Sequence, residues 1–391
     1  MDSLIVANIR QRPLRTAISI IGVALGVILV VLFVGLARGM MRDSTDRQAN
    51  VDAEVRFFPG GELSFSANPL RLSARYADAI MKGVQPTAED PDVKPKPPVA
   101  GVAVATPVGE WIQSGVGAIG FELVDGIDYS SFIEATQLHI VEGRGLDDGR
   151  SDRDNEAIVD GYYAEHNTGD DGQPVKVGSR IKALGHEFTV VGIYAPSLLA
   201  RIKIPLYTMQ QLFGGAENCS FLMIKCDRPE LAEQVKATIQ QYYPGNHVLL
   251  TSEIPSLYGQ SFRAVDIFLD VVIGLALVIS TLVILLGMYT TIIERTREIG
   301  ILKSLGASKS FIVMAIEKEA ALISALGIGF GFLVAIAGKF LIEHNTRLKI
   351  DLQPRWLLIA ALIGFLGGVI GALYPAMRAA NLDPVEAISY E

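Results

Sequence analysis

The sequence predicts an α-helical membrane protein with four transmembrane helices and a large mixed α/β extracytoplasmic domain between the first and second helix. Half of the 391 residues are apolar, and many of them lie in four long apolar runs. Each run has about 20 residues, the length that a helix needs to cross a bilayer. The net charge of −8 lies mostly in the middle of the chain. Residues 41–265 hold 30 acidic and 20 basic side chains, a net −10, so the remainder carries +2. An acidic, water-exposed insert between apolar segments accounts for this division.

The apolar runs divide the chain into nine segments. The predicted order is a cytoplasmic N-terminus (1–16), a first span (17–37), an outer domain with stalk helices at both ends (38–265), a second span (266–293), a cytoplasmic loop (294–315), a third span (316–342), an outer loop (343–355), a fourth span (356–376) and a cytoplasmic tail (377–391). Arg10, Arg12 and Arg15 precede the first run and place the N-terminus in the cytoplasm by the positive-inside rule. That run is longer than a signal-peptide core, which favours an uncleaved anchor.

The outer segment has the pattern of a mixed α/β domain. Residues 230–242 carry apolar side chains at helical spacing, and residues 84–99 are rich in proline, which indicates a mobile loop. The acidic residues 147–154 are interpreted as a solvated loop, with cation binding as the alternative. Residues 39–50 and 256–270 are amphipathic enough to continue the adjoining spans outward. Strands are expected at 110–113, 121–124, 157–159, 188–194 and 220–225.

Several classes of function lack their sequence signatures. No phosphate-binding loop G-x-x-x-x-G-K-[ST] occurs, so the sequence offers no ATP cradle. Residues 115–120 match G-x-G-x-x-G, but a strand-like run follows them instead of a helix, which favours a hairpin or loop over a dinucleotide site. The acidic charge argues against a nucleic-acid partner. The five histidines show no metal-ligand spacing, and Cys219 and Cys226 are expected to be free thiols.

The predicted cytoplasmic loop contains a short amphipathic helix. Ile299, Leu302 and Leu305 form an apolar stripe among charged residues, and Gly306 is placed to end the helix. Such a helix has no visible core of its own. It either docks in the groove of a partner protein or lies on lipid headgroups, and the residues alone leave both readings open.

The loop "ERTREIGILKSLGAS", the tail "YPAMRAANLDPVEAISYE" and the outer stretch "ELVDGIDYSSF…EGRGLDD…GHEFTVVGIY…IPLYTMQQLF" resemble the MacB-like and FtsX-like family of ABC transporter permeases. The resemblance covers nearly the whole chain. It implies that the loop is a coupling helix seated in a separate ATPase subunit, which binds ATP and Mg²⁺, and that this chain holds no cofactor and catalyses nothing. The implied ATPase-facing residues are Glu294, Arg295, Arg297, Glu298, Ile299, Leu302, Lys303, Leu305, Gly306 and Ala307. The tail residues that match the family's closing motif, for which we expect cytoplasmic docking, include Arg378, Asp383, Pro384 and Glu386.

The resemblance also implies a dimer in the bacterial inner (plasma) membrane, with a second copy or a related permease. Small-residue pairs at Gly327 and Gly331 and at Gly364 and Gly368 fit a dimer contact or packing within one subunit equally well. The function implied is ATP-driven mechanical transmission to the outer domain, for export or extraction of an amphiphilic drug, peptide, lipid or lipoprotein. A periplasmic adaptor or outer-membrane channel is a further possible partner. The alternative is a non-transporting regulator that activates a cell-wall hydrolase.

Overall fold

The computed structural model describes residues 13–61, 70–86, 94–114, 121–147, 155–170, 172–254, 257, 263–345 and 348–383. The chain divides into two compact units. One comprises Met1–Met40, Arg263–Glu343 and Leu348–Glu391, and the other comprises Met41–Phe262 with His344–Arg347. The described helix α2, Pro13–Ala49, begins in the first unit, and its last nine residues, 41–49, belong to the second.

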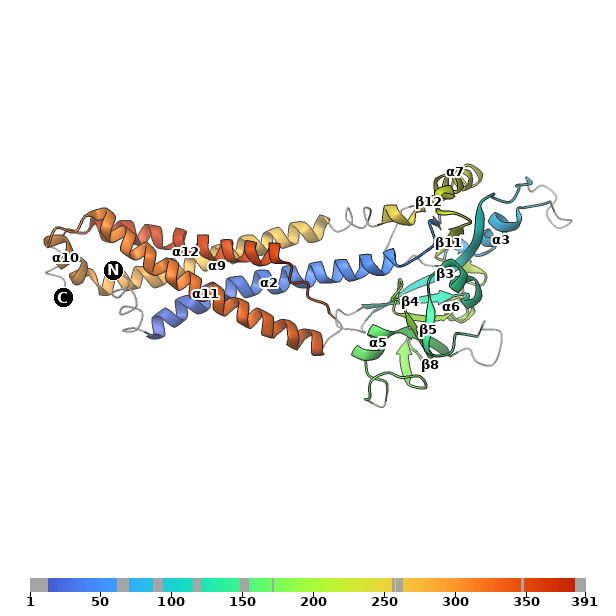
Figure 1. Cartoon of the computed structure of the whole chain (residues 1–391), viewed down its shortest axis with the longest axis horizontal. Coiled ribbons are helices and arrows are strands. Elements are labelled where there is room, and N and C mark those ends of the chain that lie inside the picture. The colour runs from blue at the N-terminus through green and yellow to red at the C-terminus, as the bar shows by residue number, and fades with distance from the viewer. Residues whose placement is uncertain are drawn as a thin grey trace. The chain divides into compact units, whose positions relative to one another are not determined.

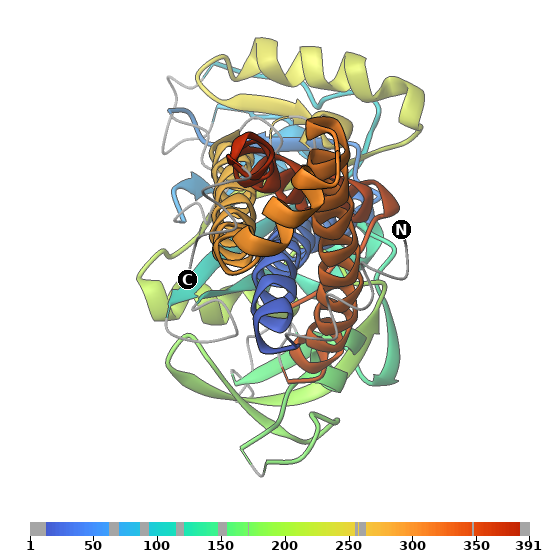
Figure 2. The same ribbon diagram turned by 90° about the vertical axis from the view of Figure 1, so that its left-hand side faces the viewer.

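The first unit is a bundle of long helices (Figures 1 and 2). Among the described residues, four helices are long and apolar enough to cross a membrane, and each includes one of the apolar runs of the sequence. The helices α2, α9, α11 and α12 are longer than the predicted spans. Helix α2 extends beyond its span to Ala49, over nearly all of the expected stalk at residues 39–50. Of the second expected stalk, residues 255–256 and 258–262 lie outside the described residues. The bounds are α2 Pro13–Ala49, α9 Arg263–Glu294, α10 Thr296–Ser304, α11 Lys309–Asn345 and α12 Pro354–Asn381.

The paired glycines bring helices of this chain together. A Cβ atom on Gly327 would lie 2.7 Å from the Val23 Cβ of α2, and one on Gly331 would lie 3.0 Å from the Val27 Cβ. On α12, Gly364 and Gly368 face side chains of α2, α9 and α11 in the same way. Because lipid supplies no hydrophobic force between helices, such close contact is a main source of packing energy. The sequence left open whether these glycines form a dimer contact or pack within one subunit. In the structure they pack against other helices of the same chain.

The second unit is a mixed α/β domain built on a ten-stranded sheet. The described strand order is β12-β1-β11-β3-β4-β9-β6-β8-β5, with β7 paired to β8, and β10 and β2 form a separate ladder. Most pairs are antiparallel, while β4 with β9 and β6 with β8 run parallel. The strands are β1 Val55–Phe58, β2 Leu72–Ser73, β3 Val102–Ser114, β4 Phe121–Ile127, β5 His139–Gly143, β6 Glu156–Asp160, β7 Arg180–Ala183, β8 His186–Ala195, β9 Ile202–Pro205, β10 Asn218–Cys219, β11 Phe221–Cys226 and β12 His247–Leu250.

Short helices cover the sheet. They are α3 Arg75–Lys82, α4 Tyr129–Ala135, α5 Gly161–His166, α6 Leu206–Phe213 and α7 Ala232–Tyr242, with 3₁₀ turns at Pro229–Leu231 and Thr251–Glu253. Helix α7 buries Val235 and Ile239, as its spacing predicts, against a core that includes Phe57 of β1. The apolar strand β11 is buried along most of its length, whereas β8 alternates and buries mainly one face. Fold class and element types thus agree with the sequence-based prediction.

Two local expectations can be compared with the structure, and a third falls mostly on residues that the structure does not describe. Residues 115–120, outside the described part, connect β3 to β4, which pair antiparallel up to Ser114 and Phe121, so a strand and not a helix follows the glycines. In the proline-rich segment, Val84 and Lys96 form a β-bridge with backbone hydrogen bonds of 2.8 and 2.9 Å, so its described ends are held in place. Of the acidic loop 147–154, residues 148–154 lie outside the description.

Candidate functional site

The candidate site is helix α10, which joins the ends of α9 and α11. The chain turns at Arg295, which leaves the helical conformation with φ −104° and ψ 12°. The Arg295 guanidinium lies 3.3 Å from the Glu319 carboxylate of α11, and both side chains are largely buried. Thr296 donates its hydroxyl to the carbonyl oxygens of Ile292 and Ile293, at 3.1 and 2.8 Å. These contacts fix the direction in which α10 leaves α9.

The inner face of α10 packs against its own bundle. Ile299 is only 8 % exposed and belongs to a cluster with Ile292 of α9, Ile312 of α11 and Ala379 of α12. The sequence predicts Ile299 on the face turned to the ATPase and shows no core for this helix. The structure differs on both points, because three helix ends provide that core.

Lys303 is a second attachment of α10. Its ammonium donates to the carbonyl oxygen of Ala380, at 3.0 Å, and to that of Leu382. The last carbonyls of a helix have no partner within the helix and carry the negative end of its dipole, so a lysine stabilises them. Lys309 of α11 similarly donates to the side-chain oxygen of Asn381, at 2.8 Å. Lys303 was expected to face the ATPase, and its charged group instead caps α12.

Gly306 ends α10 as predicted. Its φ of +94° lies in the region that favours glycine, and its N–H donates to the Lys303 carbonyl at 3.0 Å. The N–H of Ala307 donates to the Leu302 carbonyl, also at 3.0 Å, which completes a Schellman motif. The Ser308 hydroxyl then accepts the N–H of Phe311 and caps α11. The turn between the two helices is therefore short and is stabilised by local hydrogen bonds.

The outer face of α10 is apolar and exposed. Ile301 and Leu302 are each 45 % exposed, and Leu305 is 80 % exposed. At about 100° per residue these three side chains lie within about 100° of one another, while Ile299 lies about 60° beyond Leu302 on the buried side. Ile301 does not follow the spacing of the predicted stripe, so only the structure shows that it belongs to this apolar face. Its neighbour Gly300 is buried. The charged residues Glu294, Arg297 and Glu298 are also exposed.

Two of the four predicted tail residues, Arg378 and Asp383, fall within the described chain. The Arg378 guanidinium donates to the hydroxyl of Tyr289 on α9, at 2.8 Å, and lies 5.1 Å from the centre of its ring. Asp383 is exposed and is the last described residue. Pro384 and Glu386 lie outside the described residues. Among those described, no group of three or more His, Cys, Asp or Glu side chains is placed to hold a metal ion. Within the described part of this end of the bundle, the exposed apolar face of α10 is the feature that stands out.

Two family models together match most of the chain. The model described as the MacB-like periplasmic core domain matches residues 16–242, and the FtsX-like permease C-terminal model matches residues 271–384. The second match includes all of α10 and the start of the tail. A solved structure of the periplasmic region of MacB from Actinobacillus actinomycetemcomitans is 13 % identical. It covers 54 % of this chain and 95 % of its own, with a TM-score of 0.38.

Relatives of two lengths match the chain. An uncharacterised ABC transporter permease of Methanocaldococcus jannaschii is 24 % identical over 98 % of this chain and 96 % of its own length. The uncharacterised permease YknZ of Bacillus subtilis is 23 % identical over 98 % and 97 %. The macrolide export ATP-binding/permease protein MacB of Rhodospirillum rubrum is 23 % identical, and the match spans only 59 % of its length. Family models over both units, and relatives over nearly the whole chain, lead to one assignment: the chain belongs to the MacB-like and FtsX-like family of ABC transporter permeases.

Proposed function

We propose that this permease couples ATP hydrolysis by a separate ATPase subunit to motion of its α/β domain, for export or extraction of an amphiphilic substrate. Two relatives that match over nearly their whole length are named ABC transporter permeases, which favours an ATPase, binding ATP and Mg²⁺, on a partner chain. Helix α10 is the coupling element. The N-terminus, the α9–α11 connection and the C-terminus face the cytoplasm, and the α/β domain lies outside, in the orientation that Arg10, Arg12 and Arg15 favour.

One observation carries the proposal. Ile301, Leu302 and Leu305 form an exposed apolar face on helix α10, and the opposite face of this helix packs against the ends of α9, α11 and α12. Ile299, Arg295 and Lys303 tie α10 to α9, α11 and α12. A displacement of α10 by a partner bound to its exposed apolar face is therefore transmitted to α9, α11 and α12. Burial of the apolar face in a partner groove stabilises the contact by about 25 cal/mol per Å² removed from water.

The experiment replaces Leu302 with aspartate and measures binding of the partner ATPase to the purified permease. An unpaired carboxylate in a dry groove costs about 3 kcal/mol, or roughly a hundredfold in affinity. Leu302 is 45 % exposed and outside the core cluster that holds Ile299, so the permease is expected to fold and insert normally. Ser304→Asp is the matched control. This variant adds the same charge at another exposed position of α10, about 160° around the helix from Leu302.

We expect Leu302→Asp to weaken association by roughly a hundredfold and to stop transport, while Ser304→Asp keeps both. Equal binding by the two variants and the unchanged chain would show that α10 lies on lipid headgroups, and the coupling role would be lost. Co-purification of a cell-wall hydrolase without any export activity would instead favour the regulatory alternative. The dimer, and any adaptor or outer-membrane channel, are further proposals that the same purification tests.

A further inference from the structure

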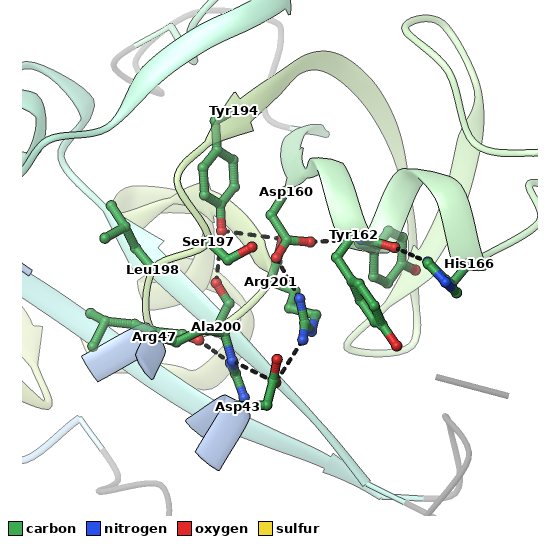
Figure 3. A network of polar contacts seen from close by, with 12 residues as sticks. Asp43, Arg47, Asp160, Tyr162, His166, Tyr194, Ser197, Leu198, Ala200 and Arg201 are labelled. Atoms are coloured by element: carbon green, nitrogen blue, oxygen red, sulfur yellow. Dashed lines mark hydrogen bonds and ion pairs between the residues drawn. The ribbon is translucent and has the colours of Figure 1, made fainter. Parts of the chain in front are cut away.

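The C-terminal end of α2, residues 41–49, which we call its outer end, contacts the loop between β8 and β9, residues 196–201 (Figure 3). Both segments belong to the α/β unit. The Leu199 N–H donates to the Arg47 carbonyl, at 3.3 Å, and an Arg47 guanidinium nitrogen donates back to the Leu199 carbonyl. The Asn50 side-chain amide donates to the Ser197 carbonyl, at 3.0 Å. The helix therefore meets the loop through both backbone and side-chain contacts.

Arg201 lies between two carboxylates at the centre of this contact (Figure 3). Its guanidinium is 2.6 Å from Asp43 of α2 and 2.6 Å from Asp160 at the end of β6. Asp160 is fully buried, and Asp43 and Arg201 are 15 % and 12 % exposed. Burial opposes the charge of Arg201, yet the two carboxylates raise its pKa above the ordinary value. Arg47 also donates to Asp43, at 3.1 Å, so one carboxylate receives both arginines.

The sheet holds the loop from the other side. Lys203 of β9 and Asp125 of β4 form an ion pair of 2.8 Å, and both side chains are fully buried. The Lys203 ammonium also donates to the carbonyls of Leu198 and Ala200, each at 3.0 Å. Asp125 accepts the Ala200 N–H, at 3.0 Å, and the Tyr194 hydroxyl donates to the Ala200 carbonyl, at 2.9 Å. A loop fixed this closely to two central strands moves with the sheet.

Helix α2 has a second attachment to the same sheet. Residues 50–54 lead directly into β1, and the Arg56 guanidinium of β1 donates to the Gln48 side chain, at 2.5 Å. Strand β1 lies four places from β9 in the strand order. A short linker alone acts as a hinge, because its φ and ψ angles turn freely. Attachment at a second, distant point removes that rotation.

We propose that Asp43, Arg47 and Arg201 form a joint that makes the outer end of α2 and the α/β domain move as one body. The joint rests on the proposed function in one respect, since it supplies the last step of transmission from α10 to the domain. Its rigidity is a property of this chain alone. It therefore has a test that requires no ATPase.

The same helix offers a matched control. Arg42 and Asp46 form an ion pair at the same i,i+4 spacing, but their side chains are 63 % and 69 % exposed and the distance is 4.0 Å. Exposed pairs of this kind contribute little to stability. The joint variant is Asp43→Asn with Arg47→Gln, and the control is Arg42→Gln with Asp46→Asn. Each removes one positive and one negative charge from α2.

The experiment measures the distance between spin labels on Met41→Cys of α2 and Lys182→Cys of β7 in the full-length chain in lipid nanodiscs. The native Cys219 and Cys226 are buried and do not compete for label. We expect one narrow distance peak for the unchanged chain and for the control, and loss of that narrow peak in the joint variant. Asp43→Asn alone, which keeps the size of the side chain, is expected to broaden the peak to a lesser extent.

Two results would overturn the joint: a broad distribution in the unchanged chain, or a joint variant as narrow as the control. A second measurement adds the partner ATPase and follows transport. Loss of transport with ATPase binding retained supports the joint. Full transport despite broad distances overturns its role in transmission and leaves the proposed function standing. The proposed function fails through a different variant, if Leu302→Asp leaves association and transport intact.

Discussion

The ammonium of Lys303 in α10 lies 3.0 Å from the carbonyl oxygen of Ala380 near the end of α12. The two residues are 77 positions apart, and the contact joins the candidate coupling helix to the C-terminal end of the last long helix. A charged donor on the free carbonyls of a helix end stabilises both helices at once.

Replacement of Lys303 by methionine is expected to loosen α10 without unfolding the bundle. Loss of a hydrogen bond from a charged group costs about 1.5 kcal/mol, which corresponds to roughly tenfold faster amide exchange in α10. Hydrogen–deuterium exchange of the peptide that contains residues 296–305 measures this. Arg297→Met is the control, since Arg297 is exposed on the same helix. Equal exchange in the two variants would contradict a capping role for Lys303.

Gly327→Val is expected to destabilise the bundle, and Gly329→Val is expected to be tolerated. A Cβ on Gly327 meets the Val23 Cβ at 2.7 Å and the Ile20 carbonyl oxygen at 3.0 Å, whereas nothing lies within 4 Å of a Cβ on Gly329. Overpacking of this kind costs about 1–3 kcal/mol. Thermal unfolding in detergent measures the difference. If the two variants melt together, α11 does not pack on α2 as described.

The two native cysteines are expected to resist alkylation in the folded protein. Burial raises the pKa of Cys219 to about 12 and that of Cys226 to about 11, and both residues are less than 3 % exposed. Only the thiolate reacts, so at pH 8 labelling is expected to be slower than that of a free cysteine by on the order of a thousandfold. Reactivity should rise with pH, because each thiol loses its proton only near its raised pKa. Mass spectrometry after maleimide treatment, with and without denaturant, follows the reaction. Rapid labelling of the native protein at pH 8 would contradict the burial of both thiols.

Silent native cysteines make the orientation testable. We expect Glu142→Cys in the α/β domain to react with a membrane-impermeant maleimide added to whole cells, and Ser304→Cys in α10 to react only after the membrane is opened. Both positions are exposed in the structure. The basis is the cluster of arginines before the first span together with the even number of candidate spans in the part of the chain that the structure describes. The reverse labelling pattern would place α10 outside, and the ATPase could not reach it.

The sequence by itself determined the spans, the intervening α/β domain and the end of α10. A bilayer demands long apolar runs, and each of the four candidate spans contains one. A glycine just after an amphipathic helix is a local signal for the end of that helix. Gly306 has the positive φ that such a helix end requires. Amphipathic spacing likewise located α7, whose buried face includes Val235. These features depend on neighbours within a few residues, which a single sequence displays directly.

The tertiary structure decided which face of each element meets which partner. Ile299 and Leu302 share an apolar pattern, but only the ends of α9, α11 and α12 make the first buried and leave the second exposed. Asp43 and Arg201 are 158 residues apart, and no local pattern distinguishes them from the many other charged residues of the α/β domain. Their ion pair exists because the fold brings α2 to the β8–β9 loop, and the energy of a charge depends on burial and on the partners that surround it.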